Sequence, residues 1–171
     1  KLVEIQNARH VEIPFADDYS LPDELGIGAA LTLVANPNSP SGTLADVASL
    51  RKVADATEGV LVVDEAYIDF SDGGSIEMLQ NHGNVIIVRT MSKSFSLAGM
   101  RIGMAIARRD LIDGLAKVKD HYNMGRLGLV AAAAAIDCIE VMRENADRVR
   151  RTREHLTVEL RKLGMEVWDS S

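Results

Sequence analysis

Short apolar runs, separated or followed by stretches with helical periodicity, constrain the fold of this chain most strongly. The runs are candidate strands at residues 11–14, 30–35, 60–64, 84–88 and 102–107. Candidate helices lie at residues 44–57, 74–80 and 110–119. Apolar runs of this length that alternate with helices are typical of a largely parallel sheet with both faces covered. We therefore predict an α/β fold with a mostly parallel sheet sandwiched by helices.

Polar motifs follow three of these runs at the points where the predicted strands end. The first, Asn-Pro-Asn-Ser-Pro-Ser-Gly, occupies residues 36–42, and the second, Asp-Glu-Ala-Tyr, occupies residues 64–67. The third, residues 89–101, is rich in hydroxyl groups and contains Lys93. The carboxyl ends of parallel strands meet at one edge of a sheet, where α/β proteins bind ligands. The sequence therefore predicts that the three motifs form a single ligand site.

Three residues of these motifs fit the chemical needs of pyridoxal phosphate. The aldehyde of this cofactor needs a lysine amine to form an imine, and its ring nitrogen needs a carboxylate. Its phosphate needs arginine and hydroxyl donors. Lys93, Asp64 and Arg101 supply the amine, the carboxylate and the guanidinium in turn.

Further hydroxyl groups complete the predicted site. Tyr67 follows shortly after the proposed ring partner, so its phenol can reach the hydroxyl of the cofactor ring. Thr90 and Ser92 can donate hydrogen bonds to the phosphate beside the guanidinium of Arg101. The resulting prediction is a cofactor site in which Lys93 is the catalytic residue.

Taken together, the three motifs resemble those of the fold-type I pyridoxal phosphate enzymes, and within them the histidinol-phosphate aminotransferases. The resemblance rests on residues 36–42 and on the strings Val-Val-Asp-Glu-Ala-Tyr-Ile-Asp-Phe and Arg-Thr-Met-Ser-Lys-Ser-Phe-Ser-Leu-Ala-Gly-Met-Arg-Ile-Gly. It implies the large-domain fold of aspartate aminotransferase. It also implies that Lys93 holds the cofactor as an imine and later moves a proton between the substrate α-carbon and the cofactor, while Asp64 pairs with the ring nitrogen.

The same resemblance implies an activity and an assembly. The expected reaction transfers an amino group between histidinol phosphate and 2-oxoglutarate in histidine biosynthesis. The expected protein is a cytoplasmic homodimer in which the neighbouring subunit completes each active site. Its partners are then a small amino donor and a 2-oxo acid acceptor, with no nucleic acid and no membrane.

One position departs from the family pattern. Many relatives carry asparagine immediately before the Pro-Ser/Thr-Gly step, where its amide meets the ring oxygen of the cofactor, and this chain has Ser39 there. Asn38, one residue earlier, is the candidate to replace that amide. Ser39 can instead bind the ring oxygen directly or through water, so the two alternatives stay open.

The C-terminal part of the chain predicts two long helices, at residues 127–141 and 145–163, with Gly164 as a natural stop. The resemblance implies that residues 1–143 form the C-terminal part of the cofactor-binding large domain. Residues 144–171 are then the interdomain helix and the start of a small α/β domain. The family's complete enzyme is about twice as long. We therefore expect this chain to be a fragment without the arginine that grips the substrate carboxylate.

Charge and composition exclude several classes of function. The formal net charge is −6, and the basic residues between positions 143 and 162 are interleaved with acidic ones, so a nucleic-acid surface is not expected. The single Cys138 cannot form an internal disulfide, and the 4 histidines lack the spacing of metal ligands. No apolar run reaches the roughly 18 residues of a membrane helix. The sequence predicts a soluble protein in a reducing compartment.

Alternative functions explain fewer of the motifs. The apolar run that ends at Asp64 resembles the acidic strand end of a P-loop ATPase, but no Gly-x-x-x-x-Gly-Lys-Ser/Thr loop occurs. Residues 91–94, Met-Ser-Lys-Ser, resemble the signature loop of class I aminoacyl-tRNA synthetases, but no His-x-Gly-His partner occurs. Within the cofactor class, two alternatives stay open: a threonine-phosphate-type decarboxylase and another aromatic or aliphatic aminotransferase. An alternative from a different class is a catalytically silent pyridoxal-phosphate-fold domain that acts as a regulatory or binding partner.

Overall fold

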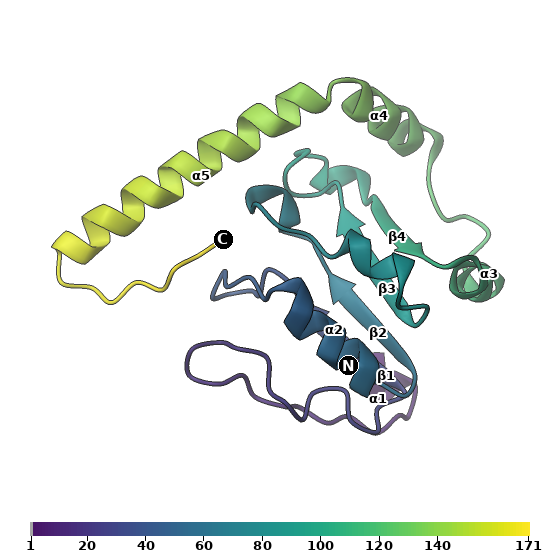
Figure 1. Ribbon diagram of the computed structural model, residues 1–171. Coiled ribbons are helices and arrows are strands. Elements are labelled where there is room, and N and C mark those ends of the chain that lie inside the picture. Colours follow the sequence, from purple (N-terminus) through teal and green to yellow (C-terminus); the bar gives the residue numbers. More distant parts are fainter. Residues whose placement is uncertain (1) are drawn as a thin grey trace.

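A 4-stranded sheet forms the centre of the computed structural model, which describes residues 2–171 (Figure 1). The strands, in their order across the sheet, are β1 (Leu31–Ala35), β2 (Val60–Asp64), β3 (Val85–Thr90) and β4 (Gly103–Ala107). The first three run parallel, and β4 runs antiparallel to β3. The predicted α/β class with a mostly parallel sheet is therefore confirmed.

Helices connect and follow the strands. The α-helices are α1 (Leu2–Ile5), α2 (Val47–Ala56), α3 (Arg109–Val118), α4 (Arg126–Asp137) and α5 (Ile139–Lys162). Short 3₁₀ helices lie at η1 (Ile68–Phe70), η2 (Ile76–Gln80) and η3 (Ala98–Met100). In Figure 1, α5 runs across the top of the molecule, above the sheet. No helix between residues 2 and 171 combines the length and the apolar character that a membrane crossing needs.

One face of the sheet packs against α2 and η2 to form the core. Side chains alternate between the two faces along each strand, so every second residue points to this side. The core consists of buried residues from the parallel strands, α2 and η2: Val34, Leu50, Val53, Ala54, Leu61, Val63, Met78, Val85 and Ile87. Their packing fixes the strands and therefore the starting points of the loops at the carboxyl ends.

The opposite face of β1 is more open among the described residues. Leu31 is 57% exposed and Leu33 is 64% exposed, although they alternate with the buried Thr32 and Val34. The sequence predicted that helices cover both faces of the sheet. Within residues 2–171, β1 shares a buried core with α2 on the side of Val34. The strand is thus apolar on both faces, and its open side is a surface that further protein contacts can bury.

One strand predicted in the first half of the chain is absent, and one predicted helical stretch forms a 3₁₀ helix. Residues 11–14 form no strand and are largely exposed, because the apolar run finds no partner strand in the described part of the chain. The stretch at 74–80 contains the 3₁₀ helix η2 in place of an α-helix. Short helical segments commonly adopt this tighter form, since they end before an α-helix could gain many hydrogen bonds.

The two predicted C-terminal helices are present, but the break between them lies a few residues earlier than the sequence predicted. The helix predicted at 127–141 ends at Asp137, and α5 begins at Ile139. Cys138 between them leaves the helical conformation, with φ −106° and ψ 36°, and no proline or glycine marks this position. The predicted stop at Gly164 is confirmed, because its φ of +79° is a left-handed conformation that glycine adopts without strain. The domain boundary near residue 143 falls inside α5 and stays a prediction.

Candidate active site

The ends of the three parallel strands lie side by side. Ala35 pairs with Asp64 in the sheet, and Asp64 pairs with Val88. Just beyond these pairs, the N–H of Asn36 donates to the carbonyl oxygen of Asp64 at 2.9 Å. The N–H of Glu65 donates to the carbonyl oxygen of Val88 at 2.8 Å. The three motifs therefore begin at one edge of the sheet, as their order in the sequence predicted.

Lys93 and Tyr67 meet at this edge. The Nζ atom of Lys93 lies 4.9 Å from the centroid of the Tyr67 ring, within the range of a cation–π contact. Tyr67 is the residue before η1, and Lys93 belongs to the bend that follows β3. Both side chains are exposed, so the amine is accessible to a ligand while one side of it rests on the aromatic ring.

Asp64 is the last residue of β2, and its side chain is exposed. Its Oδ1 atom accepts a hydrogen bond of 3.0 Å from the N–H of Ala66. The strand pairing fixes the backbone of Asp64, and this bond orients its carboxylate. A carboxylate held in this way can accept a hydrogen bond from a protonated ring nitrogen.

Thr90 and Ser92 form a pair of hydroxyls at the end of β3. The Oγ1 atom of Thr90 lies 3.0 Å from Ser92 Oγ and 3.1 Å from the carbonyl oxygen of Ile102. It also accepts a hydrogen bond of 3.1 Å from the N–H of Ser92. Both side chains are half-buried. The structure thus brings together the two hydroxyls that the sequence predicted to share a ligand.

Arg101 returns to the same region because β4 runs antiparallel to β3. Thr90 pairs with Gly103, which follows Arg101 closely in the chain. The backbone of Arg101 is left-handed with φ +55°, a conformation that is uncommon for a residue with a side chain and that occurs at functional sites. Within residues 2–171, its guanidinium makes one hydrogen bond, to the carbonyl oxygen of Ala98 at 3.2 Å. Further N–H donors are therefore available to an anion.

Asn38 is engaged within its own loop. Its carboxamide nitrogen donates to Ser41 Oγ at 2.7 Å. Its backbone N–H donates to the carbonyl oxygen of Thr43, and its carbonyl oxygen accepts from the N–H of Gly42, both at 2.8 Å. Ser39 is exposed beside it. The contact of Asn38 with a cofactor stays a prediction.

Asn36 is a structural residue that the sequence reasoning did not single out. Its side chain is buried, with 2% of the residue exposed. The carboxamide nitrogen donates to the carbonyl oxygen of Ala45 at 3.1 Å, and Oδ1 accepts from the N–H of Ala45 at 2.8 Å. This pair of bonds closes the loop between β1 and α2. A polar residue immediately after an apolar run and before a proline is the signal that could have found it.

Glu65 anchors the opposite side of the second motif. It is 1% exposed, and its Oε2 atom accepts hydrogen bonds from Arg89 Nε at 2.8 Å and Arg89 Nη2 at 2.7 Å. Its Oε1 atom accepts from the hydroxyl and from the N–H of Ser75. Glu65 therefore connects β3 to the start of η2 and has a structural role.

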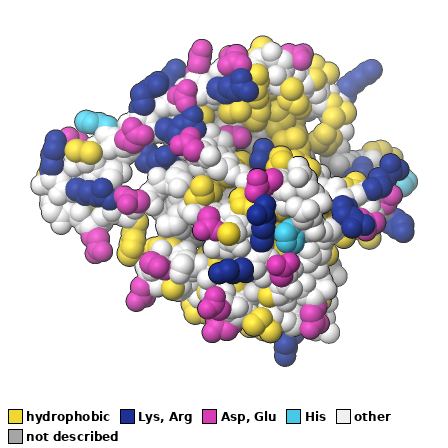
Figure 2. Space-filling model, in the orientation of Figure 1, with side chains coloured by type: hydrophobic (Ala, Val, Ile, Leu, Met, Phe, Trp, Pro, Cys, Tyr) yellow, Lys and Arg dark blue, Asp and Glu magenta, His cyan; other side chains and the backbone are white. Residues whose placement is uncertain are grey.

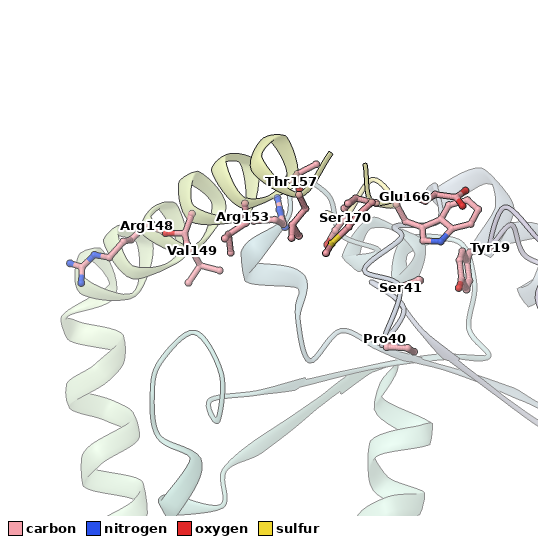
Figure 3. Close-up of a pocket in the computed structure, with 15 residues that line it drawn as sticks. Tyr19, Pro40, Ser41, Arg148, Val149, Arg153, Thr157, Glu166 and Ser170 are labelled. Atoms are coloured by element: carbon pink, nitrogen blue, oxygen red, sulfur yellow. Dashed lines mark hydrogen bonds between the residues drawn. The ribbon is translucent and has the colours of Figure 1, made fainter. Parts of the chain in front are cut away.

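A hollow of about 770 Å³ lies elsewhere, between α5, the C-terminal segment and the loop around Pro40 (Figure 3). Arg148 and Arg153 of α5 contribute to its wall. The ring of Trp168 packs edge-to-face on Tyr19, with ring centroids 5.3 Å apart. Within residues 2–171, none of the residues predicted to bind the cofactor lines this hollow, but Pro40 and Ser41 of the first motif do.

Sequence comparison identifies relatives of known family. The family model for aminotransferase class I and II matches residues 15–171. Histidinol-phosphate aminotransferase 1 of Trichormus variabilis is 41% identical over 171 residues, covering 99% of this chain and 49% of that protein. Histidinol-phosphate aminotransferase of Geobacter sulfurreducens is 41% identical over 167 residues, covering 97% and 48%. The chain therefore spans about half the length of the curated relatives it matches.

A solved structure supports the same grouping. Histidinol-phosphate aminotransferase from Sinorhizobium meliloti, crystallised in complex with pyridoxal-5′-phosphate, matches with a TM-score of 0.88 and 30% sequence identity. The match covers 98% of this chain and 48% of that chain. The motif order, the strand arrangement and the match over residues 15–171 agree, and the chain belongs to the aminotransferase class I and II family.

Proposed function

We propose that the protein carrying this chain is a pyridoxal-phosphate-dependent aminotransferase that transfers an amino group between histidinol phosphate and 2-oxoglutarate in histidine biosynthesis. The observation that carries the proposal is the Lys93 amine, 4.9 Å from the centre of the Tyr67 ring, at the sheet edge where Asp64 ends β2. Identities of 41% to histidinol-phosphate aminotransferases support the choice of substrate.

The groups at this edge fit the cofactor by their chemistry. Pyridoxal phosphate carries an aldehyde, a ring nitrogen and a ring hydroxyl, and the edge offers an amine, a carboxylate and a phenol. Lys93 would hold the aldehyde carbon, Asp64 the ring nitrogen and Tyr67 the ring hydroxyl. All three side chains are exposed, so a ligand can reach them without displacing the core.

The phosphate fits the end of β3. Arg101 offers guanidinium donors, and Thr90 and Ser92 offer hydroxyl groups beside each other. Asn38 is the proposed partner of the ring oxygen, and its bond to Ser41 would have to be shared or exchanged for this contact. The exposed Ser39 is the alternative donor.

The residues of this chain would handle protons at the reacting carbon. Bound pyridoxal phosphate supplies an electron sink for the negative charge that develops at the substrate α-carbon. The free amine of Lys93 can accept the α-proton at Nζ and donate it again. Asp64 favours a protonated ring nitrogen by accepting its hydrogen bond. The ring of Tyr67 restricts the positions that the amine can occupy.

Assembly as a cytoplasmic homodimer is part of the proposal. Exposed apolar residues of α4, such as Leu127 at 83% and Val130 at 63%, support an assembly that covers them. The free thiol of Cys138 is compatible with a reducing compartment. In such a dimer the neighbouring subunit would complete each active site.

Reductive trapping of the cofactor tests the proposal. The complete protein is incubated with pyridoxal phosphate and reduced with borohydride, and the pyridoxyl-modified peptide is mapped by mass spectrometry. We expect modification at Lys93, with the exposed Lys117 of α3 as the internal control that stays unmodified. Absence of any modified lysine in the folded protein with excess cofactor would overturn the proposal and favour a catalytically silent fold.

Substrate tests separate the remaining alternatives. Histidinol phosphate should convert the bound cofactor to its amine form in a single turnover, and 2-oxoglutarate should restore the aldehyde form. A faster response to aromatic amino acids would indicate an aromatic aminotransferase. Release of carbon dioxide from threonine phosphate would identify a decarboxylase.

A further inference from the structure

We infer that Asp69 and Ser94 are positioning residues that hold the Lys93 amine against the Tyr67 ring. We also infer that α5 stabilises the position of the Asp69–Ser94 pair. The inference rests on the proposed function, because it concerns the residue that would move the substrate proton. It assigns roles to two side chains that lie outside the cofactor-binding set described above. It is carried by one shielded hydrogen bond and by the contacts of α5 with the same segment.

The hydroxyl of Ser94 donates a hydrogen bond to Oδ2 of Asp69. Ser94 is 3% exposed, so water has little access to its side of this bond. A hydroxyl bonded to a carboxylate in such a place is stronger than a neutral pair on the surface, and leaving either partner alone is unfavourable. The bond is therefore suited to holding two chain segments in one relative position.

The two segments are those that carry the amine and the ring. Ser94 is the residue after Lys93, and Asp69 lies in η1, shortly after Tyr67. The Asp69–Ser94 bond and the contact of 4.9 Å between Lys93 Nζ and the Tyr67 ring thus connect the bend after β3 to the region of η1 at two points. Loss of the bond would let the two segments move apart and would increase the range of positions that Lys93 Nζ can occupy.

Helix α5 also contacts η1, the segment that contains Asp69. Arg150 Nη1 donates to the carbonyl oxygen of Asp69 and Arg153 Nη1 to that of Phe70, both at 3.4 Å. The two arginines lie on one face of α5, and Arg150 also binds Asp147 on the same helix. These bonds are long, so we expect α5 to have a smaller influence on Lys93 than the Asp69–Ser94 bond has.

The chain offers a matched control for the loss of a buried serine–carboxylate bond. Ser75 is 0% exposed, and its hydroxyl donates to the carboxylate of Glu65. Ser75→Ala removes the same kind of bond as Ser94→Ala, but Ser75 is not next to the site lysine. A general loss of stability should appear in both variants, whereas a positioning effect should appear only in Ser94→Ala.

The experiment compares Ser94→Ala, Asp69→Asn, their double variant and Ser75→Ala in the complete protein with cofactor. The readouts are kcat, KM, the deuterium isotope effect on kcat with α-deuterated substrate, and visible circular dichroism of the bound cofactor. Misplacement of a reacting group by about 1 Å can cost on the order of 100-fold in rate. We expect kcat to fall by about 10- to 100-fold with KM within about twofold.

Two signatures distinguish positioning from packing. The isotope effect should rise, because proton transfer by a loosened Lys93 becomes slower than the other steps, and the visible circular dichroism should weaken. The double variant should be no worse than the more affected single variant, since both single changes break one bond. Arg150→Met should shift the same readouts less, and Arg151→Met on α5 should not shift them.

Unchanged isotope effect and circular dichroism in both Ser94→Ala and Asp69→Asn would overturn the inference, as would equal changes in Ser75→Ala. If Ser94→Ala does not fold, Asp69→Asn at its half-buried position decides the question with the same readouts. Borohydride modification of the wild-type protein separates this inference from the proposed function. Modification at Lys93 with unaffected variants refutes the positioning role alone, whereas missing modification refutes the function on which it rests.

Discussion

The sheet region, residues 31–107, contains a core of fully buried apolar side chains, although one face of β1 stays open, whereas helices α3 and α4 expose many of their apolar side chains. Leu50 of α2 and Met78 of η2 are 0% exposed. In contrast, α3 contains no buried residue within the described chain, and Leu127 of α4 is 83% exposed. Figure 2 shows hydrophobic side chains gathered over α4. The sheet region therefore obtains its core from its own residues, and the helices need further protein surface to bury theirs.

The helices of the two regions also begin differently. Helix α2 begins at Asp46, whose carboxylate accepts a hydrogen bond of 2.6 Å from the N–H of Ser49. Helices α3 and α5 follow Arg108 and Cys138, whose side chains make no capping hydrogen bond. Helices without such caps depend more on packing for their stability. In the sheet region, α2 has both a capping side chain and a buried apolar face. In the C-terminal helices of the described chain, the capping side chains are missing and many apolar side chains are exposed.

Replacing Lys93 with alanine should have the largest effect, because it removes the proposed chemistry and leaves the core of the sheet region intact. We expect the rate of amino transfer by the complete protein to fall by about 10⁴-fold or more, the upper range for a positioned acid–base group. Thermal unfolding should change little, since Lys93 is exposed. The rate is followed by glutamate formation. Lys117→Ala in α3 is the matched control, and equal losses in both variants would contradict the role of Lys93.

Leucine truncations test the difference in burial directly. Leu50→Ala should lower the free energy of unfolding by about 4 kcal/mol, because it leaves a cavity in a closed core. Leu127→Ala should change the stability of the 171-residue chain by less than about 0.5 kcal/mol, since its side chain is already in water. Urea unfolding of the 171-residue chain and of the complete protein measures both.

The complete protein should respond differently to Leu127→Ala. If another surface covers α4 there, the loss of stability should rise toward that of Leu50→Ala. Equal losses for the two leucines in the 171-residue chain would break the comparison, because they would show that α4 is already packed without further protein.

Removing Glu65 tests the buried charges beneath the site. Glu65→Ala leaves Arg89 and the buried hydroxyl of Ser75 without their carboxylate, and loss of one partner of a buried pair costs about 3 kcal/mol. We expect a cost close to this value and not above it, because the side chain of Arg89 is 27% exposed. The control is Glu77→Ala, which breaks the exposed pair with Arg51 and should cost less than about 1 kcal/mol. Similar losses would show that burial does not decide the effect.

The strands of the sheet and the positions of the motifs at their ends could be predicted because they depend on neighbours in the sequence. The run of valines and leucine before Asp64 favours a buried parallel strand, and the residue that ends such a strand lies at the ligand edge of the sheet. The same reasoning placed Lys93 after β3. The motif order was therefore sufficient to predict that the three motifs begin at one edge of the sheet, whereas the contact between the Lys93 amine and the Tyr67 ring became visible only in the structure.

Contacts between distant side chains could not be predicted in the same way. Ser94 binds Asp69 and Glu65 binds Arg89 because the loops bring them together, and neither pair has a spacing that a helix or strand would impose. The run at 11–14 failed as a strand for a related reason, since an apolar run becomes a strand only where a partner strand is within reach. Such features follow from the completed fold.

The cap of α2 should give the smallest effect and a defined dependence on pH. Two interactions with Ser49 lower the pKa of Asp46 below its ordinary value of 3.8: the larger effect comes from the backbone N–H and the smaller one from the hydroxyl. A lowered pKa in the folded state means that the charged carboxylate stabilises α2 above pH 3.8, and that this contribution is lost as the pH falls through the folded-state pKa. Asp46→Asn keeps an acceptor for the cap without a titrating charge, so its unfolding midpoint should follow the wild type at acidic pH and lie slightly below it at neutral pH. Urea unfolding as a function of pH checks this, with Asp55→Asn near the other end of α2 as the comparison. A constant difference between wild type and Asp46→Asn at every pH would contradict the assigned shift and would leave packing alone to distinguish α2 from the uncapped helices.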